Sequence, residues 1–176
     1  MDAGDLFLTR LSTYPLMKEL LDQLAGYDRW ANSRYVQRLQ RVPEEWLDRE
    51  AGGSFPTIRA TLLHIRDAEN TWWGRITGNS TTWPASTDRS IGSLLPINEL
   101  FHGMVLALDE DRLRELVTYH DLKGNAHMQP AWQLILHCLN HSTQHRGQLI
   151  SQMRALGMED IPANDLVVHQ RSFTIH

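Results

Sequence analysis

Apolar side chains recur at steps of three and four residues in four long stretches of the chain, with polar side chains between them. This spacing is typical of amphipathic helices that turn one face toward a core. It predicts four helices, over residues 13–40, from a cap at Ser54 to about Thr77, from about Pro96 to about Val117, and from about Pro130 to Leu156. Four such helices predict an all-α fold, a four-helix bundle that forms a single domain over residues 1–176.

Local signals support the ends of these helices. Pro43 disfavours helical geometry in the residue before it, which ends the first helix. Ser54 is a suitable N-cap for the second helix, and Pro56 fits its first turn. Gly157 suits the left-handed conformation with which helices often stop, so we expect the fourth helix to end there.

The segment between the third and fourth predicted helices has a different pattern. "VTYHDL", residues 117–122, is rich in residues that favour strands, and Gly124-Asn125 supplies a turn. A short hairpin before the last helix is therefore expected. The tail from residue 161 onward is expected to add one short helix.

Composition excludes several classes of protein. With 17 basic and 21 acidic residues the net charge is -4, whereas nucleic-acid-binding surfaces are usually basic. The only cysteine is Cys138, so the chain has no internal disulfide, which fits a reducing compartment. Residues 1–10 lack the apolar core of a secretory signal, and no apolar run approaches the length of a membrane span. These features predict a cytoplasmic globular protein without nucleic-acid or membrane partners.

Three histidines follow one another at one-turn spacing on the fourth predicted helix. At 100° per residue His145 falls at the margin of the apolar stripe, His141 beyond it, and His137 further out. Residues four apart on a helix have Cβ atoms about 5–6 Å apart, so two imidazoles at this spacing can meet one ion. A further ligand has to come from another helix.

His64 on the second predicted helix is the candidate for that ligand. It borders the apolar stripe, and its neighbours on the same face are all small: Thr57, Thr61, Ala68 and Thr71. Small neighbours leave space beside the imidazole for an ion, a water or a substrate. Histidines at the edge of an apolar face are also common as hydrogen-bonded boundary residues. From the residues alone, a metal site and a polar stripe both remain open.

Other catalytic motifs are missing from the chain. "HSTQH" lacks the glutamate of the zinc-protease motif H-E-x-x-H, and no pair of Glu-x-x-His sequences suggests a di-iron site. A glycine-rich phosphate loop, a G-x-S-x-G turn and a paired-cysteine zinc motif are also absent from the sequence. Cys138 lies on the apolar stripe, so we expect it to pack in the core.

Three blocks of the sequence together resemble a known family. They are "GYDRWANSR" (26–34), "SFPTIRATLLHIRDAENTWWGRITG" (54–78) and "LHCLNHSTQHRGQLISQMRALG" (136–157). Their order and spacing are similar to those of the DinB-like, or DinB/YfiT, four-helix bundles over nearly the whole chain. The resemblance implies an antiparallel up-down-down-up bundle and a homodimer.

The resemblance also implies a metal site and a range of activities. Family members bind a divalent metal, commonly nickel or zinc, through three histidines. Carried over by motif position, these ligands are His64, His141 and His145, while His137 is expected in an outer position or on the solvent edge. Members of known activity are transferases or isomerases that use thiols such as mycothiol, bacillithiol or glutathione. Others are regarded as metal-dependent hydrolases.

The leading hypothesis from sequence is therefore a metal-dependent hydrolase or thiol transferase acting on a small molecule. Three neutral imidazoles leave a divalent ion with at least one open position, as in catalytic sites. The rival is a non-catalytic metal- or ligand-binding protein of a stress response, and a bundle whose histidines bind nothing is a further alternative. The sequence identifies no catalytic acid or base.

Seven further residues have open roles at this stage. Asp67 and Glu69 lie at suitable levels on the second helix. Gln148 either orients a water or ligand or is a surface amide. Arg146 is expected to make structural salt bridges. The tryptophans, Trp30, Trp72 and Trp73, either wall a cavity or pack in the core.

Overall fold

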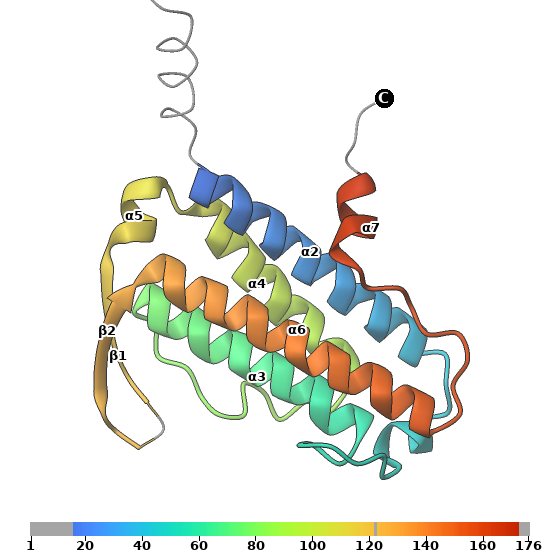
Figure 1. Cartoon of the computed structure of the whole chain (residues 1–176). Helices are drawn as coiled ribbons and strands as arrows, with labels where there is room; N and C mark the ends of the chain where they lie inside the picture. Colours follow the sequence, from blue (N-terminus) through green and yellow to red (C-terminus); the bar gives the residue numbers. More distant parts are fainter. Residues whose placement is uncertain (1–15, 122, 173–176) are drawn as a thin grey trace, which may run out of the picture.

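The computed structural model describes residues 16–121 and 123–172, which form a mostly helical protein with a small sheet (Figure 1). The long helices are α2 (Leu16–Leu39), α3 (Ile58–Thr77), α4 (Leu94–Ala107) and α6 (Ala131–Ala155). The short elements are helices α5 (Glu110–Arg114) and α7 (Leu166–Arg171), 3-10 turns at Glu44–Asp48 and Ile91–Ser93, and strands β1 (Leu116–His120) and β2 (Ala126–Pro130). None of the described helices combines the length and the apolarity needed to cross a bilayer.

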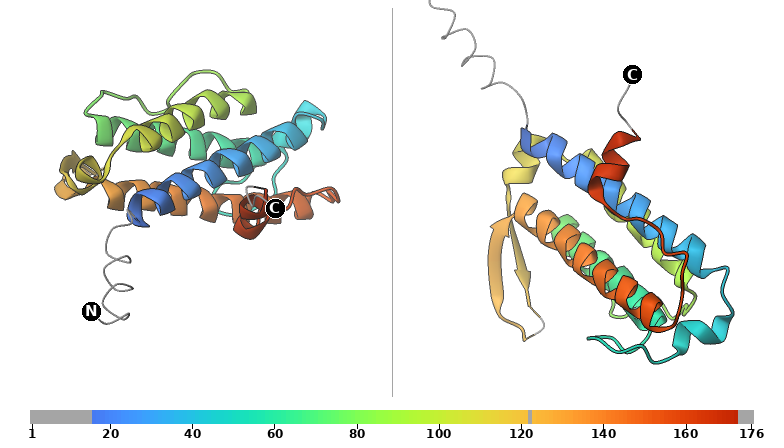
Figure 2. Two further views of the ribbon diagram at one scale, coloured as in Figure 1. Left: turned by 90° about the horizontal axis from the view of Figure 1, so that it is seen from above. Right: turned by 45° about the vertical axis from the view of Figure 1, so that its right-hand side comes forward.

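The four long helices run side by side (Figures 1 and 2). Helices α2 and α6 run in one direction, and α3 and α4 run in the opposite direction (Figure 1). Each long helix packs against two others, in the ring order α2, α4, α3, α6. This order makes α3 and α6 neighbours, although they are more than 50 residues apart in the sequence. Their contact brings His64 to the histidines of α6.

The third helix is shorter than the sequence pattern predicts. Helix α4 ends before Leu108, and Leu108 and Asp109 both have extended backbone. The Asp109 carboxylate accepts a hydrogen bond from the backbone N–H of Arg112 at 2.9 Å and so caps the new helix α5. Leu116 and Val117, predicted to be helical, lie in β1. The prediction was wrong here because an aspartate cap interrupts an otherwise continuous apolar pattern.

The other helix ends lie close to their predicted positions, with one change of cap. Thr57, and not Ser54, caps α3: its hydroxyl accepts a backbone N–H of the first turn at 3.1 Å. Helix α6 is followed by Gly157, whose φ of 77° is left-handed. The N–H of Met158 then donates to the carbonyl of Met153 at 2.9 Å, which closes the helix end. The predicted start of the first helix, at residue 13, lies outside the described residues.

The expected hairpin before the last long helix is present. Strands β1 and β2 pair antiparallel, with Tyr119 opposite His127 and Val117 opposite Gln129. The turn contains Gly124, which has a φ of 83°. Because side chains alternate between the faces of a strand, these four paired residues share one face of the hairpin. The expected short helix in the tail is also present, as α7 beside α2.

The core has two apolar clusters with a polar layer between them. One cluster includes Tyr35, Leu62 and Leu149, and the other includes Leu21 and Ile135. Between them, six buried polar side chains form what we call the polar layer: Asp28, Asn32, Glu69, Asn98, Ser142 and Arg146. Each member of the polar layer makes a hydrogen bond to another member. Burial of these groups is tolerated because they hydrogen-bond one another, although Nε of Arg146 has no partner within the described residues.

Candidate metal centre

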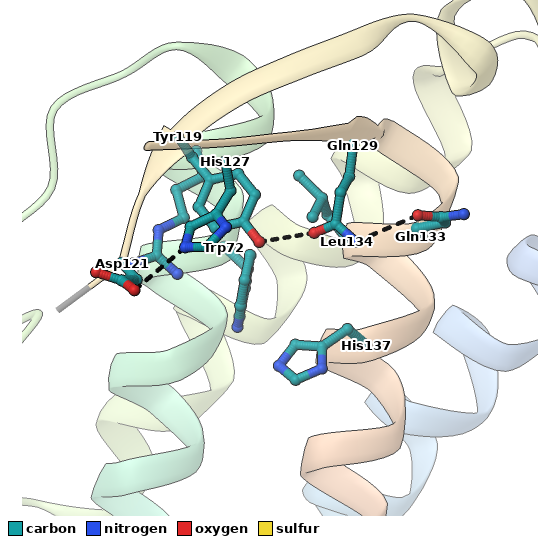
Figure 3. A pocket seen from close by; sticks show the side chains of 9 residues that line it. Trp72, Tyr119, Asp121, His127, Gln129, Gln133, Leu134 and His137 are labelled. Atoms are coloured by element: carbon teal, nitrogen blue, oxygen red, sulfur yellow. Dashed lines mark hydrogen bonds and ion pairs between the residues drawn. The ribbon is translucent and has the colours of Figure 1, made fainter. Parts of the chain in front are cut away.

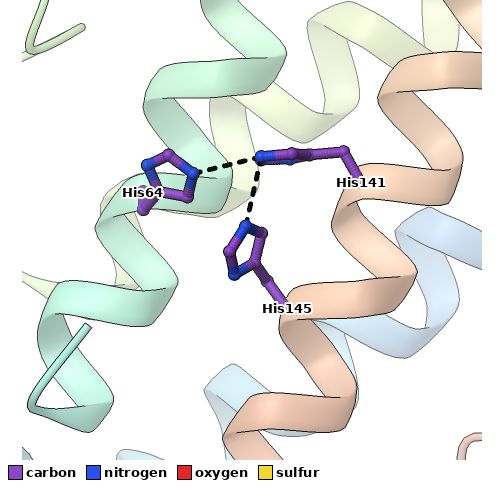
Figure 4. Close-up of side chains that lie close together, drawn as sticks. All are labelled: His64, His141 and His145. Atoms are coloured by element: carbon purple, nitrogen blue, oxygen red, sulfur yellow. Dashed lines mark hydrogen bonds between the residues drawn. The ribbon is translucent and has the colours of Figure 1, made fainter. Parts of the chain in front are cut away.

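His64 on α3 and two histidines on α6 turn their rings toward one small space (Figure 4). Nε2 of His141 lies 3.1 Å from Nε2 of His64 and 3.1 Å from Nε2 of His145. The ring centroids of the three pairs are between 4.4 and 4.9 Å apart. The structure therefore brings together the three histidines that were singled out in the sequence.

The separations between the nitrogen atoms suit a shared divalent ion. A zinc–imidazole bond is about 2.0–2.1 Å long, so ligand nitrogens lie about 3.3 Å apart around a tetrahedral ion and about 2.9 Å apart at right angles. The two observed separations of 3.1 Å fall between these values. The three histidines are thus positioned to bind a metal ion.

Hydrogen bonding alone does not account for this arrangement. A neutral imidazole has one N–H group and one bare nitrogen. Nε2 of His141 faces two other Nε2 atoms, yet its single N–H group or lone pair can point at only one of them. The buried Nδ1 of His141 has no hydrogen-bond partner in the part of the chain that the structure describes. Three bare Nε2 atoms directed at one cation would remove the conflict among the close nitrogens.

Burial keeps the three histidines neutral. Burial, together with the nearby His145, lowers the pKa of His64 to about 4. Burial also lowers the pKa of His141 to about 4, with His145 and His64 adding to the effect. The pKa of His145 is lowered as well, again by burial. All three rings are therefore unprotonated at pH 7, which is the form that ligates a metal.

Gln148 fixes the orientation of His145. Oε1 of Gln148 lies 3.3 Å from Nδ1 of His145, so the Nδ1–H donates to it and Nε2 remains bare toward the other histidines. The amide nitrogen of Gln148 donates to the carbonyl of Phe55 at 3.1 Å. Gly53 permits this close approach, because a Cβ at that position would lie 2.6 Å from Nε2 of Gln148. Gln148 is half-buried with both ends of its amide hydrogen-bonded, so it is not a surface amide, and the group that it orients is the His145 ring.

Two aromatic rings from loops border the histidines. Phe55 stacks on His64, with centroids 4.1 Å apart and an interplanar angle of 28°. Trp83 approaches His64 edge-on at 5.7 Å. The space expected beside His64 is therefore partly filled, because Phe55 covers the ring from outside the helix. Neither aromatic was singled out in the sequence, since loop residues have no periodicity that would place them.

The loop that carries Phe55 is tied to α6 by two glutamines. The Phe55 carbonyl accepts a hydrogen bond from Gln152 at 2.6 Å in addition to the one from Gln148. Gln152 also accepts a hydrogen bond from the hydroxyl of Thr61 at 2.9 Å. These contacts explain why a loop residue occupies a defined position against His64.

The two acidic candidates of α3 have structural partners. Asp67 is near enough to favour the charged form of His64, but its carboxylate accepts hydrogen bonds from Nε of Arg66 at 2.8 Å and from the N–H of Ala85 at 2.9 Å. Those bonds hold the loop that contains Trp83. The other acid, Glu69, belongs to the polar layer. Neither carboxylate hydrogen-bonds a histidine of the site within the described residues.

The remaining candidates lie at greater distance from the three histidines. His137 is exposed and one turn from His141, with ring centroids 6.2 Å apart, so it occupies the solvent edge as expected. Trp72 packs edge-on against His137 at 4.9 Å, whereas Trp30 packs against α7. Cys138 is fully buried, and burial raises the pKa of its thiol well above the ordinary value. Its expected role in packing is confirmed.

Arg146 and Trp73 are the last two candidates from the sequence, and neither contributes to the space between the three histidines. Arg146 is paired with Asp28 inside the polar layer, which confirms the expected structural salt bridge. Trp73 lines a shallow apolar groove beside α4, on the side of α3 that packs against that helix. It therefore does not wall the space between the three histidines.

We expect Gln148→Leu to weaken zinc binding by about 10–100-fold, the usual effect of losing a hydrogen bond to a metal-binding imidazole. Leucine keeps most of the volume but leaves the Nδ1–H of His145 without an acceptor. Titration of metal-free protein against a chromophoric chelator would measure the change. Gln144→Leu, an exposed position one residue before His145, should keep the wild-type affinity. Equal affinity in both variants would show that Gln148 does not position the site.

The fold and the site define a class: a mostly helical protein in which one histidine from α3 and two from α6 are placed to bind a metal ion. A model of the DinB family matches residues 17–172, and the chain belongs to the DinB family. The curated relative Protein DinB of Bacillus subtilis (strain 168) is 23% identical over 159 residues, which cover 84% of this chain and 92% of the relative. The family resemblance seen in the sequence is confirmed.

Proposed function

We propose that this protein is a metal-dependent enzyme that acts on a small molecule, either as a hydrolase or as a transferase that uses a low-molecular-weight thiol. The observation that carries the proposal is the convergence of three neutral imidazoles through their Nε2 atoms. Membership of the DinB family supports it. His64, His141 and His145 are the proposed ligands. Nickel or zinc is the proposed ion, because imidazole nitrogen suits both metals.

The proposed chemistry depends on a site with three protein ligands. A divalent ion held in this way keeps an open position, and it lowers the pKa of a water or thiol that binds there. The chain contributes the remaining conditions. Gln148 keeps His145 in the ligating tautomer, and Phe55 and Trp83 limit access of water on the side of His64.

Membership of the family supports three further proposals about the context of this activity. We propose that the four long helices constitute its antiparallel up-down-down-up bundle and that two copies form a homodimer. We also propose that the protein acts in the cytoplasm on a small-molecule substrate, with a thiol as cosubstrate in the transferase case.

The rival proposal is a non-catalytic protein that binds a metal or ligand in a stress response. One observation favours it: within the described residues no carboxylate hydrogen-bonds any of the three histidines. The two proposals differ in turnover and agree in metal binding.

The test is turnover by protein loaded with zinc or with nickel, compared with protein stripped by a chelator. Panels of esters, amides and thiol adducts would be screened, with and without added thiol. The enzyme proposal predicts an activity that is lost on stripping and restored by the metal. Gln144→Leu, at an exposed position outside the site, should retain it. A stoichiometric metal with no turnover on any panel would favour the binding protein.

A further inference from the structure

A second cavity, of about 300 Å³, lies between the β1–β2 hairpin and helices α3 and α6 (Figure 3). We call it the hairpin cavity. Its helical side includes Trp72 from α3 and His137 from α6, and its hairpin side includes Tyr119 and His127. The volume is at the lower end of the range for small-molecule sites.

The hairpin cavity is close to the three histidines. His137 precedes the proposed ligand His141 by one helical turn, and their ring centroids are 6.2 Å apart. Trp72 lies against the other side of His137 at 4.9 Å. The imidazole of His137 therefore lies between the hairpin cavity and the candidate metal centre. A small molecule in this cavity would have its inner end near the three histidines.

The cavity contains an arginine held between aromatic rings. The guanidinium carbon of Arg75 lies 4.4 Å from the ring centroid of Trp72 and 5.1 Å from that of Tyr119. One nitrogen, Nη2, donates to the carbonyl of His120 at 2.8 Å. This contact and the two rings fix the plane of the guanidinium, which has five N–H groups in a fork that matches a carboxylate.

No carboxylate among the described residues forms an ion pair with Arg75. Asp121 also lines the cavity, but its carboxylate is already engaged. Oδ1 accepts hydrogen bonds from the N–H groups of Lys123 and Asn125, and Oδ2 accepts one from the Asn125 side chain and lies 3.1 Å from Nε2 of His127. These bonds stabilise the hairpin turn. The charge of Asp121 acts on Arg75 from the same cavity and favours its cationic form, but the two side chains form no ion pair.

Further donors face the same space. The hydroxyl of Tyr119 donates to Oε1 of Gln129 at 2.7 Å, and Nε2 of Gln129 donates to Oε1 of Gln133 at 3.3 Å (Figure 3). The side-chain oxygen of Gln133 already accepts this hydrogen bond, so the NH₂ group of Gln133 is available to donate to a ligand. The side chains available to a ligand are thus a cation, an amide donor and flat rings.

We propose that the hairpin cavity binds the carboxylate of a small organic acid through Arg75, with the rest of the molecule lying along Trp72 and His137 toward the three histidines. One part of the inference rests on the proposed function: that the bound acid belongs to the substrate of the enzyme. Binding of the carboxylate itself requires only Arg75 and the cavity.

Binding of three acids of increasing length would test the inference: benzoate, phenylacetate and 3-phenylpropanoate, each compared with its neutral amide. Affinities would be measured by NMR titration of zinc-loaded protein. We expect at least one acid to bind about tenfold or more tightly than its amide, because hydrogen bonds to charged groups are the stronger ones. The shifted resonances should belong to the hairpin and to the facing turns of α3 and α6.

Three variants separate the possible sources of this preference. Arg75→Gln should abolish the preference for the acid while leaving the zinc content unchanged. Arg49→Gln is the matched control, because Arg49 is also stacked on a tryptophan, Trp46 at 4.4 Å, but does not line the cavity. His141→Ala, expected to lose zinc, should still prefer the acid.

The outcomes distinguish this inference from the proposed function. Equal affinity for acids and amides in zinc-loaded wild type would overturn the carboxylate site and leave the metal enzyme standing. A preference that persists in Arg75→Gln would overturn it too, since the acid would then be held elsewhere. A preference that depends on Arg75 in a protein without turnover would support the carboxylate site and count against the enzyme.

Discussion

Arg146→Met should lower the free energy of unfolding by about 3–5 kcal/mol, the range measured when one partner of a buried ion pair is removed. Arg146 is fully buried, donates through Nη1 to the carboxylate of Asp28 and to Oδ1 of Asn32, and donates through Nη2 to Thr143. Methionine fills a similar volume, so the loss is one of charge and hydrogen bonds. The negative charge of Asp28 would remain buried without its partner.

Glu69→Gln, in the same layer, should cost about 1 kcal/mol or less, because glutamine resembles the neutral form of the acid that burial favours. Burial raises the pKa of Glu69 well above its ordinary value, and the neighbouring Asp28 raises it further. With Glu69 protonated, Arg146 and Asp28 balance each other, and the acid can donate a hydrogen bond to Asp28. Urea unfolding at pH 7 would measure both substitutions.

The pH dependence of the free energy of unfolding provides a second test of the Glu69→Gln prediction. A group whose pKa is higher in the folded state binds more protons folded than unfolded, so stability falls as pH rises above its unfolded pKa. Wild type should therefore lose stability relative to Glu69→Gln as pH is raised from about 4.5, the ordinary value for glutamate. A glutamine variant as unstable as Arg146→Met, with no such pH trend, would show that Glu69 is ionised.

His141→Ala is expected to reduce bound metal from about one ion per chain to none detectable. Its Nε2 is within 3.1 Å of both other Nε2 atoms, so its removal leaves two ligands on different helices. We expect the affinity for zinc to fall by more than about 100-fold, beyond the effect of losing an outer hydrogen bond. Elemental mass spectrometry of protein from unsupplemented cells and zinc titration would measure the two quantities.

Two controls test whether the loss of metal in His141→Ala comes from removal of a ligand. The His137→Ala variant, one turn away and exposed, should retain the wild-type metal content. Thermal unfolding of metal-free His141→Ala should be close to that of metal-free wild type, since the variant removes a buried Nδ1 that lacks a partner. Stoichiometric metal in His141→Ala would refute the three-histidine site.

The histidines were predictable because helical geometry is periodic. Placing residues at 100° per step ordered His145, His141 and His137 from the margin of the core toward solvent, and the structure has them buried, half-buried and exposed in that order. His64 followed from its position beside an apolar stripe, and the family motif supplied the same set. A ligand set on regular helices can therefore be read from spacing and motif together.

Residues held by tertiary contacts were not predictable in this way. Phe55 reaches His64 because glutamines of α6 hold its loop, and Trp83 because Asp67 holds another. The polar layer depends on partners from four helices, and no local pattern identified Glu69 as buried. The break at Asp109 was missed because the apolar spacing continues across it.

The polar layer has a consequence for the alignment of the helices along their axes. Apolar clusters tolerate sliding, since leucines can repack against other leucines, but a slip of one turn, about 5.4 Å, would place Arg146 against apolar side chains. The two ligand-bearing helices, α3 and α6, both contribute to this layer, through Glu69 and through Ser142 and Arg146. The same slip would carry His64 out of reach of His141. The polar layer therefore fixes the axial alignment of α3 and α6 that brings the three histidines together, although none of its members lies among the proposed ligands.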